Sequence, residues 1–98
     1  MEVQYKNKKL HRVCTDANVA RRTYGENMAR KIHQRIDELT AIDSVETLIQ
    51  CHIGRCHLLS GDRKNQYAMD LVHPYRLIFI KISGNIQIVE VQEITDYH

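Results

Sequence analysis

The sequence lacks the features of an exported, membrane-spanning or disulfide-stabilised chain. Its first twelve residues, MEVQYKNKKLHR, contain no apolar core of the kind that a signal peptide needs. The longest run of bulky apolar side chains, residues 77–80, is far shorter than the roughly 20 residues of a membrane span. Cysteine occurs only at Cys14, Cys51 and Cys56, an odd number that argues against a disulfide framework. We therefore expect a cytoplasmic chain without membrane contact.

Motifs for nucleotides, nucleophiles and metals are also missing. The chain has no glycine-rich phosphate loop, no P-loop and no serine nucleophile elbow. Residues 51–57 do carry four potential metal ligands, which are Cys51, His52, Cys56 and His57. A structural zinc site usually takes two ligand pairs separated by a longer loop, and no second pair occurs here. The crowding favours ordinary thiols over zinc, so we expect no metal and no cofactor.

Length and charge indicate one small domain, which we place at residues 1–98. The net charge is only +2, but it is unevenly distributed. Residues 1–35 hold nine lysine and arginine side chains against three acidic ones, a net charge of +6. Such a segment suits a polyanion or an acidic protein partner. A solvated helix surface explains the same charges, and charge alone favours that simpler interpretation.

Hydrophobic spacing predicts helices in the first half of the chain, after a short strand at residues 3–5. A basic helix is expected at residues 8–14, with Asp16 capping the segment that follows. From residue 24 onward one helix face carries Met28, Ile32, Ile36 and Leu39, and a second set of side chains is expected off that face: Arg30, Lys31 and Arg35. Residues 43–46 resemble a capping box that opens a helix ending at residue 50.

The second half has the pattern of short strands. They are expected at residues 55–59, 66–72, 75–82 and 86–91, with turns at 60–65, 73–74 and 83–85. Short connections force neighbouring strands to run antiparallel. The predicted fold class is therefore α+β, with an N-terminal strand and two or three helices packed on an antiparallel meander.

The side chains that remain for chemistry are histidine, arginine, lysine and tyrosine. Six histidines are many for a chain with one phenylalanine and no tryptophan. This set suits metal-free RNA cleavage, in which the 2′-hydroxyl attacks and needs a base, an acid for the leaving oxygen and cations for the phosphate. Histidine serves as acid or base near neutral pH, and arginine pairs bidentately with phosphate oxygens. A single histidine on a small domain is more often structural.

Three stretches in the C-terminal half carry a resemblance to a known family. Residues 57–63, HLLSGDR, are similar to the pattern H-x-L-K-G-D-R; residues 75–79, YRLIF, are similar to an aromatic-R-I-T-F strand; and the chain closes with D-Y-H at residues 96–98. In this order and spacing they resemble the HigB-type killer proteins of the RelE/ParE toxin superfamily. The resemblance covers residues 54–98, and the N-terminal half agrees only in its pattern of a strand, helices and then a sheet.

The resemblance implies a type II toxin that cuts messenger RNA in the ribosome and so inhibits translation. His57 and His98 would share the general acid and base work, Asp96 would orient a neighbour, and Tyr97 would position a base or the scissile phosphate. Phosphate or RNA contacts would come from Arg63, Lys64 and Arg76. The implied partners are a cognate helix-turn-helix (HigA-like) antitoxin, the ribosome and messenger RNA. Operator DNA would be bound only through the antitoxin complex.

One departure from the family pattern keeps alternatives open. Ser60 stands where the family often has lysine, so a cation beside His57 is missing unless Arg63 or Lys64 supplies it. The alternatives are a ParE-like toxin that binds DNA gyrase, a non-catalytic RNA-binding or adaptor domain, and an inactive toxin remnant. Paired histidines are not expected in the ParE-like proteins, so His57 and His98 favour the nuclease.

Overall fold

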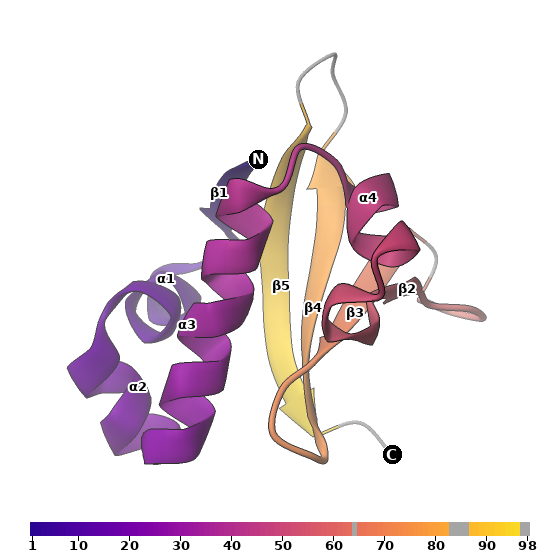
Figure 1. The fold of residues 1–98 in the computed structure, drawn as a ribbon. Coiled ribbons are helices and arrows are strands. Elements are labelled where there is room, and N and C mark those ends of the chain that lie inside the picture. The colour runs from indigo at the N-terminus through magenta and orange to yellow at the C-terminus, as the bar shows by residue number, and fades with distance from the viewer. Residues whose placement is uncertain (64, 83–86, 97–98) are drawn as a thin grey trace.

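The computed structural model describes residues 1–63, 65–82 and 87–96, and its centre is a five-stranded sheet. The strand order is β1-β5-β4-β3-β2 (Figure 1). The strands are β1 (Glu2–Tyr5), β2 (His57–Leu58), β3 (Gln66–Asp70), β4 (Tyr75–Ile82) and β5 (Ile88–Asp96). The four strands β2 to β5 form an antiparallel meander, and β1 joins β5 in parallel. The predicted α+β architecture is confirmed, and the parallel edge strand adds to it.

The helices are α1 (Lys8–Thr15), α2 (Ala17–Tyr24), α3 (Glu26–Ala41) and α4 (Val45–Gln50), followed by a 3₁₀ turn, η1 (Ile53–Arg55). The predicted two or three helices are thus four, because Gly25, at φ 90°, separates α2 from α3. Asp16 caps α2 as expected, accepting from the backbone N–H of Asn18. Ser44, rather than Asp43, caps α4. Glu46 therefore closes no capping box and instead pairs with Lys81 at 2.7 Å.

The helices cover one face of the sheet and bury the core there. Buried residues of α1, α2, α3 and α4 form one cluster with alternate residues of β3, β4 and β5. In that cluster the sheet contributes Met69, Leu77, Phe79, Val89 and Val91. Alternation along a strand sends every second side chain to the same face, so the residues between these point away from the helices. We call the two sides the helix face and the open face.

Arg35 corrects the predicted helix face of α3. The buried residues of α3 are Met28, Ala29, Ile32, Arg35 and Leu39, and Arg35 is only 9% exposed. Its Nε donates to the carbonyl oxygen of Asp70 at 2.7 Å, and its Nη1 donates to Glu38 at 2.8 Å. The prediction that Arg35 lies off the apolar face is wrong, because spacings of four, three and four residues follow a 3.6-residue helix better than repeated fours.

The strand bounds differ from the predictions at the ends. β5 continues to Asp96, five residues beyond the predicted end, whereas the predicted strand at 55–59 shrinks to β2 because η1 occupies its beginning. β3 ends at Asp70, two residues early, and β4 has the predicted bounds. The predicted turn at 83–85 lies outside the described residues. Among the described helices, none is long and apolar enough to cross a membrane.

Candidate functional site

Strand pairing arranges the open face in two rows of side chains. In the first, Asp70 of β3 pairs with Arg76 of β4, and Arg76 pairs with Thr95 of β5. Arg55 ends η1, just before β2, and its guanidinium lies beside the Asp70 carboxylate. Paired residues project from the same face of a sheet. We call Arg55, Asp70, Arg76 and Thr95 the arginine row.

The second row lies two residues along the strands, roughly 7 Å from the first. His57 pairs with Ala68, Ala68 with Ile78, and Ile78 with Glu93, and we call these four residues the histidine row. Ala68 and Ile78 are fully buried beneath Leu59, which follows β2. His57 of β2 and Arg76 of β4 therefore share the open face, with β3 between them.

The hydrogen bond of His57 fixes which ring nitrogen carries a proton. His57 Nδ1 lies 2.9 Å from the carbonyl oxygen of Arg55. A carbonyl oxygen can only accept, so Nδ1 is the donor, and in the neutral ring Nε2 keeps its lone pair. The side chain is half-buried. The imidazole is therefore oriented with its basic nitrogen away from the backbone contact, as a general base requires.

Arg63 crosses the open face from the β2–β3 loop. Its Nη1 forms an ion pair with Glu93 of the histidine row and lies 3.3 Å from Gln66 Oε1. Because β3 and β4 lie between this loop and β5, the pair holds the loop across the sheet. The predicted RNA contact Arg63 therefore lies on the same face as His57, with its charge paired to a carboxylate.

The arginine row contains two ion pairs that share one carboxylate. Asp70 Oδ2 lies 3.2 Å from Arg55 Nε, and Asp70 Oδ1 lies 3.7 Å from Arg76 Nε. Sequence reasoning missed Arg55 and Asp70. Asp70 faces Arg76 once β3 and β4 are in register, and Arg55 reaches Asp70 from the turn that precedes β2. That register depends on loop lengths that the hydrophobic pattern alone did not give.

The structure brings three of the predicted site residues to one face, namely His57, Arg63 and Arg76. Asp96 pairs with Tyr75, and alternation puts it on the helix face together with Ile94 and not beside His57. Lys64, Tyr97 and His98 lie outside the described residues. The carboxylates that stand beside the predicted cations are Asp70 and Glu93.

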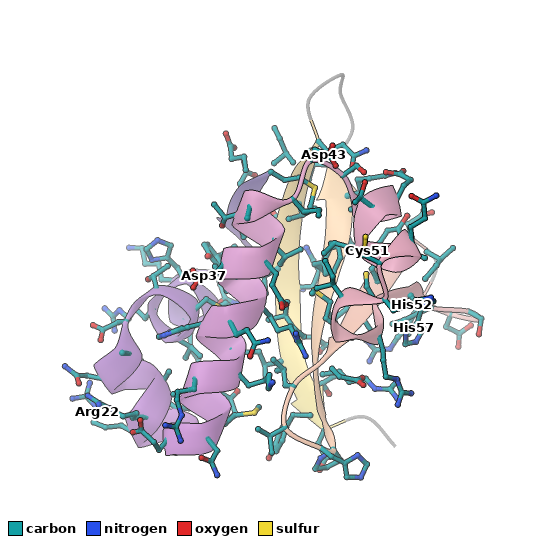
Figure 2. The ribbon with its side chains drawn as sticks, viewed as in Figure 1. Arg22, Asp37, Asp43, Cys51, His52 and His57 are labelled. Carbon is teal, nitrogen blue, oxygen red and sulfur yellow. The ribbon has the colours of Figure 1, made fainter. Side chains whose placement is uncertain are left out.

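The basic N-terminal third lies on the other side of the molecule. Its exposed cations belong mainly to α1, α2 and α3, which pack on the helix face. Figure 2 shows Arg22 of α2 and His57 at opposite sides of the molecule. Much of the charge of residues 1–35 therefore lies on these helices rather than beside His57.

The two cysteines of residues 51–57 lie in different environments. Cys56 is buried, as is Cys14, and burial raises the pKa of each thiol to about 12. Cys51 is exposed at the end of α4, and Figure 2 shows it above His52 and His57. Within residues 1–63, 65–82 and 87–96, no group of three or more histidine, cysteine or acidic side chains could hold a metal ion.

Comparisons with known proteins give a fold and no sequence family. No family model and no curated protein matches this chain. Among solved structures, the YoeB/ParE toxin from Agrobacterium tumefaciens superposes with a TM-score of 0.68 at 16% identity over 100% of both chains. The fold is that of the YoeB/ParE toxins. A chain of the YoeB-YefM complex from Staphylococcus aureus superposes with a TM-score of 0.62 at 15% identity, over 100% of this chain and 97% of the other.

Proposed function

We propose that this chain is the toxin of a type II toxin–antitoxin pair, a HigB-type endoribonuclease that cuts messenger RNA in the ribosome. The observation that carries the proposal is the open face, where His57 and Arg76 lie together on a YoeB/ParE fold. Both residues belong to the stretches that resemble the HigB-type proteins. The fold alone does not choose between a nuclease and a gyrase inhibitor, so the proposal of a nuclease rests on these side chains.

The proposed chemistry is metal-independent general acid and base catalysis. His57 Nε2 takes the proton of the RNA 2′-hydroxyl, whose oxygen attacks the adjacent phosphorus. The bond from phosphorus to the 5′-oxygen breaks, and an acid returns a proton to that oxygen. The products are a 2′,3′-cyclic phosphate and a 5′-hydroxyl. The carbonyl of Arg55 stabilises the imidazolium that forms, because Nδ1 donates to it.

The other roles follow the motif assignments. His98 is the proposed acid, Tyr97 positions the base or the scissile phosphate, and Asp96 orients a neighbour. Arg76 neutralises phosphate charge, and Arg63 and Lys64 contact the RNA. Since Arg63 is paired with Glu93, RNA must compete with that carboxylate for the guanidinium. Ser60 supplies no cation, so more of the phosphate charge falls to the arginine row.

The proposed protein partner is a cognate antitoxin of the helix-turn-helix, HigA-like type, through which alone the pair would bind operator DNA. One of the similar structures is a YoeB-YefM complex, in which a protein of this fold is seen with a partner. The exposed cations of α1 to α3 suit an acidic segment of such a partner, and they leave the open face to RNA and the ribosome. Cytoplasmic action is part of this proposal, because the ribosome is its site.

Expression in a bacterial host without an antitoxin tests the proposal. We expect growth arrest with cleaved messenger RNA, and we expect His57→Ala to relieve both while the protein stays soluble. Normal growth with intact, soluble wild-type protein would contradict the toxin function.

The same cells distinguish the second candidate, a ParE-like gyrase inhibitor, which the fold of the Agrobacterium protein keeps open. Growth arrest with intact messenger RNA, lost DNA supercoiling and no effect of His57→Ala would favour gyrase inhibition. Association with RNA without any cleavage would favour a non-catalytic RNA-binding domain.

A further inference from the structure

A small cavity lies where the open face meets the end of the β3–β4 hairpin. Its volume is about 180 Å³, and its lining includes Arg55, Asp70, His73, Pro74, Tyr75 and Arg76. Two guanidinium groups and one carboxylate thus line one concave site. A concave site with an excess of arginine has the chemistry of an anion receptor, and guanidinium groups match phosphate oxygens in shape and charge.

Asp70 contacts the Nε atom of both arginines. Its two carboxylate oxygens face Nε of Arg55 at 3.2 Å and Nε of Arg76 at 3.7 Å. The Arg55 side chain nevertheless stays 76% exposed, while that of Arg76 is 26% exposed. The carboxylate therefore fixes the direction of the two side chains without covering Arg55, which remains accessible to a ligand.

The backbone beneath Arg55 is held in an unusual conformation. Arg55 has φ 52°, and His52 and Gly54 are also left-handed, at φ 55° and 59°. A left-handed conformation is unfavourable for a residue other than glycine and persists only where the surroundings enforce it. Here the surroundings include Arg35, since a Cβ on Gly54 would lie 2.9 Å from Arg35 Nε. Such conformations concentrate at functional sites.

We propose that Arg55 joins Arg76 across Asp70 to form a two-arginine site for a backbone phosphate of the RNA strand, with Asp70 as a positioning residue. This inference rests on the proposed function and adds two residues to it. Arg55 ends η1 and precedes His57 by two residues, whereas Arg76 lies two strands away in the sheet, roughly 10 Å or more from His57. Of the two arginines, Arg55 is thus the nearer to His57. It takes the place of the lysine that the family often has at position 60.

Binding of an uncleavable RNA tests the site without requiring catalysis. The probe is a 2′-O-methyl oligoribonucleotide, offered free and as the message in a ribosome, and the form that the wild-type protein binds more tightly is used. We expect Arg55→Gln to weaken binding about tenfold, as for the loss of one charged hydrogen bond. The slope of log affinity against log salt should fall by about 0.7, the value for one phosphate contact on a single strand.

Arg22→Gln is the matched control, because Arg22 is an exposed arginine on the other side of the molecule. It should leave both affinity and salt slope unchanged. Arg55→Lys should keep the slope and recover only part of the affinity, since lysine keeps the charge without the guanidinium fork. Wild-type affinity and slope in Arg55→Gln would overturn the proposal, as would the absence of any RNA binding by the wild type.

Asp70→Asn gives a test of opposite sign. If Asp70 only repelled phosphate, removing its charge would strengthen RNA binding. As a positioning residue it should instead weaken binding several-fold while the melting temperature stays close to that of the wild type. The NMR signals of the Arg55 and Arg76 Nε–H groups should shift in the variant and, in the wild type, on addition of RNA. Stronger binding in Asp70→Asn would contradict the positioning role.

Inorganic phosphate separates an RNA site from a site for a free anion. It should compete with RNA and shift the same two NMR signals only at far higher concentration. Tight binding of inorganic phosphate with no effect of Arg55→Gln on RNA would overturn the RNA assignment. RNA binding that depends on Arg55, without any cleavage, would support this phosphate site and reject the nuclease function. Normal cleavage and unchanged RNA binding in Arg55→Gln would support the nuclease function and reject this phosphate site.

Discussion

The two faces of the central strands use the same backbone for opposite purposes. On the helix face, Leu77, Phe79 and Val91 have no exposed surface and belong to the buried cluster that includes residues of α1, α2, α3 and α4. On the open face, their neighbours include Arg76, Asp70 and Glu93, which are charged and partly exposed. On β4 a two-residue period thus assigns alternate side chains to folding and to chemistry, and on β5 a register shift opposite Ile78 and Phe79 moves Glu93 to the open face. A substitution should therefore affect stability or activity according to the face that its side chain occupies.

The largest expected effect lies at the chain end, where folding and activity should separate most. Deletion of residues 97–98 leaves β5, which ends at Asp96, complete. We expect a loss of stability of at most roughly 1–2 kcal/mol. Loss of a general acid or base should slow RNA cleavage by about a hundred- to ten-thousand-fold. Melting and cleavage of the two chain lengths are compared, and a shortened protein that cuts RNA at full rate would remove His98 from the site.

Adjacent substitutions on β4 test the division between the faces directly. Leu77→Ala opens a cavity in the core and should cost about 2–5 kcal/mol of unfolding free energy. Arg76→Ala removes a partly exposed ion pair and should cost at most about 1 kcal/mol. Cleavage should fall at least about tenfold in Arg76→Ala under conditions where it remains folded. Equal losses of stability in the two variants, measured by urea unfolding, would contradict the division of roles between the helix face and the open face.

Arg35 is an exception to this division between the faces, because it is a charged residue within the helix-face packing. Arg35→Met leaves Glu38 and the Asp70 carbonyl without their partner and should destabilise the protein by about 2–3 kcal/mol. Arg30→Met, at an exposed position of the same helix, should change stability by no more than about 0.5 kcal/mol. Urea unfolding of both variants is the measurement. Indistinguishable midpoints would mean that Arg35 has no structural role.

Much of the fold follows from local sequence signals, and the misses have physical causes. The β-branched run at residues 75–82 predicted β4 correctly, and Asp16 predicted the start of α2, since each signal lies within a few neighbouring residues. The end of β5 was missed because Thr95 and Asp96 are held by pairing with Arg76 and Tyr75, which are distant in sequence. Edge pairing of β1 with β5 has the same non-local origin.

The candidate site shows the same limit. His57, Arg63 and Arg76 were selected by motif resemblance, and strand register puts all three on one face. Asp70 and Arg55 carry no motif of their own and gain their relation to Arg76 only through pairing and the left-handed turn. Arg35 was misplaced because arginine is rarely buried without partners, and one of its two partners, the backbone carbonyl of Asp70, is 35 residues away in the sequence.

The smallest effect at neutral pH concerns the cysteines. Iodoacetamide should label only the exposed Cys51 in the folded protein, because burial raises the pKa of the Cys14 and Cys56 thiols to about 12. An unfolded thiol titrates near 9, so the folded state should lose stability as pH rises from about 9 toward 12 and be unaffected below 9. Mass spectrometry and melting curves measure both effects. A second label at neutral pH would contradict the burial of these thiols.

The chemistry of the RNA ends shows most clearly whether the open face is a metal-independent nuclease site. Wild-type protein is incubated with translating ribosomes and messenger RNA in excess chelator, and the products are mapped at both ends. His57→Asn and His52→Asn form a matched pair, because the two histidines lie close together in the chain and only His57 belongs to the histidine row. We expect 2′,3′-cyclic phosphate and 5′-hydroxyl ends from the wild type and His52→Asn, and no cleavage by His57→Asn. Cleavage abolished by the chelator, 5′-phosphate ends, or full activity of His57→Asn would contradict this expectation.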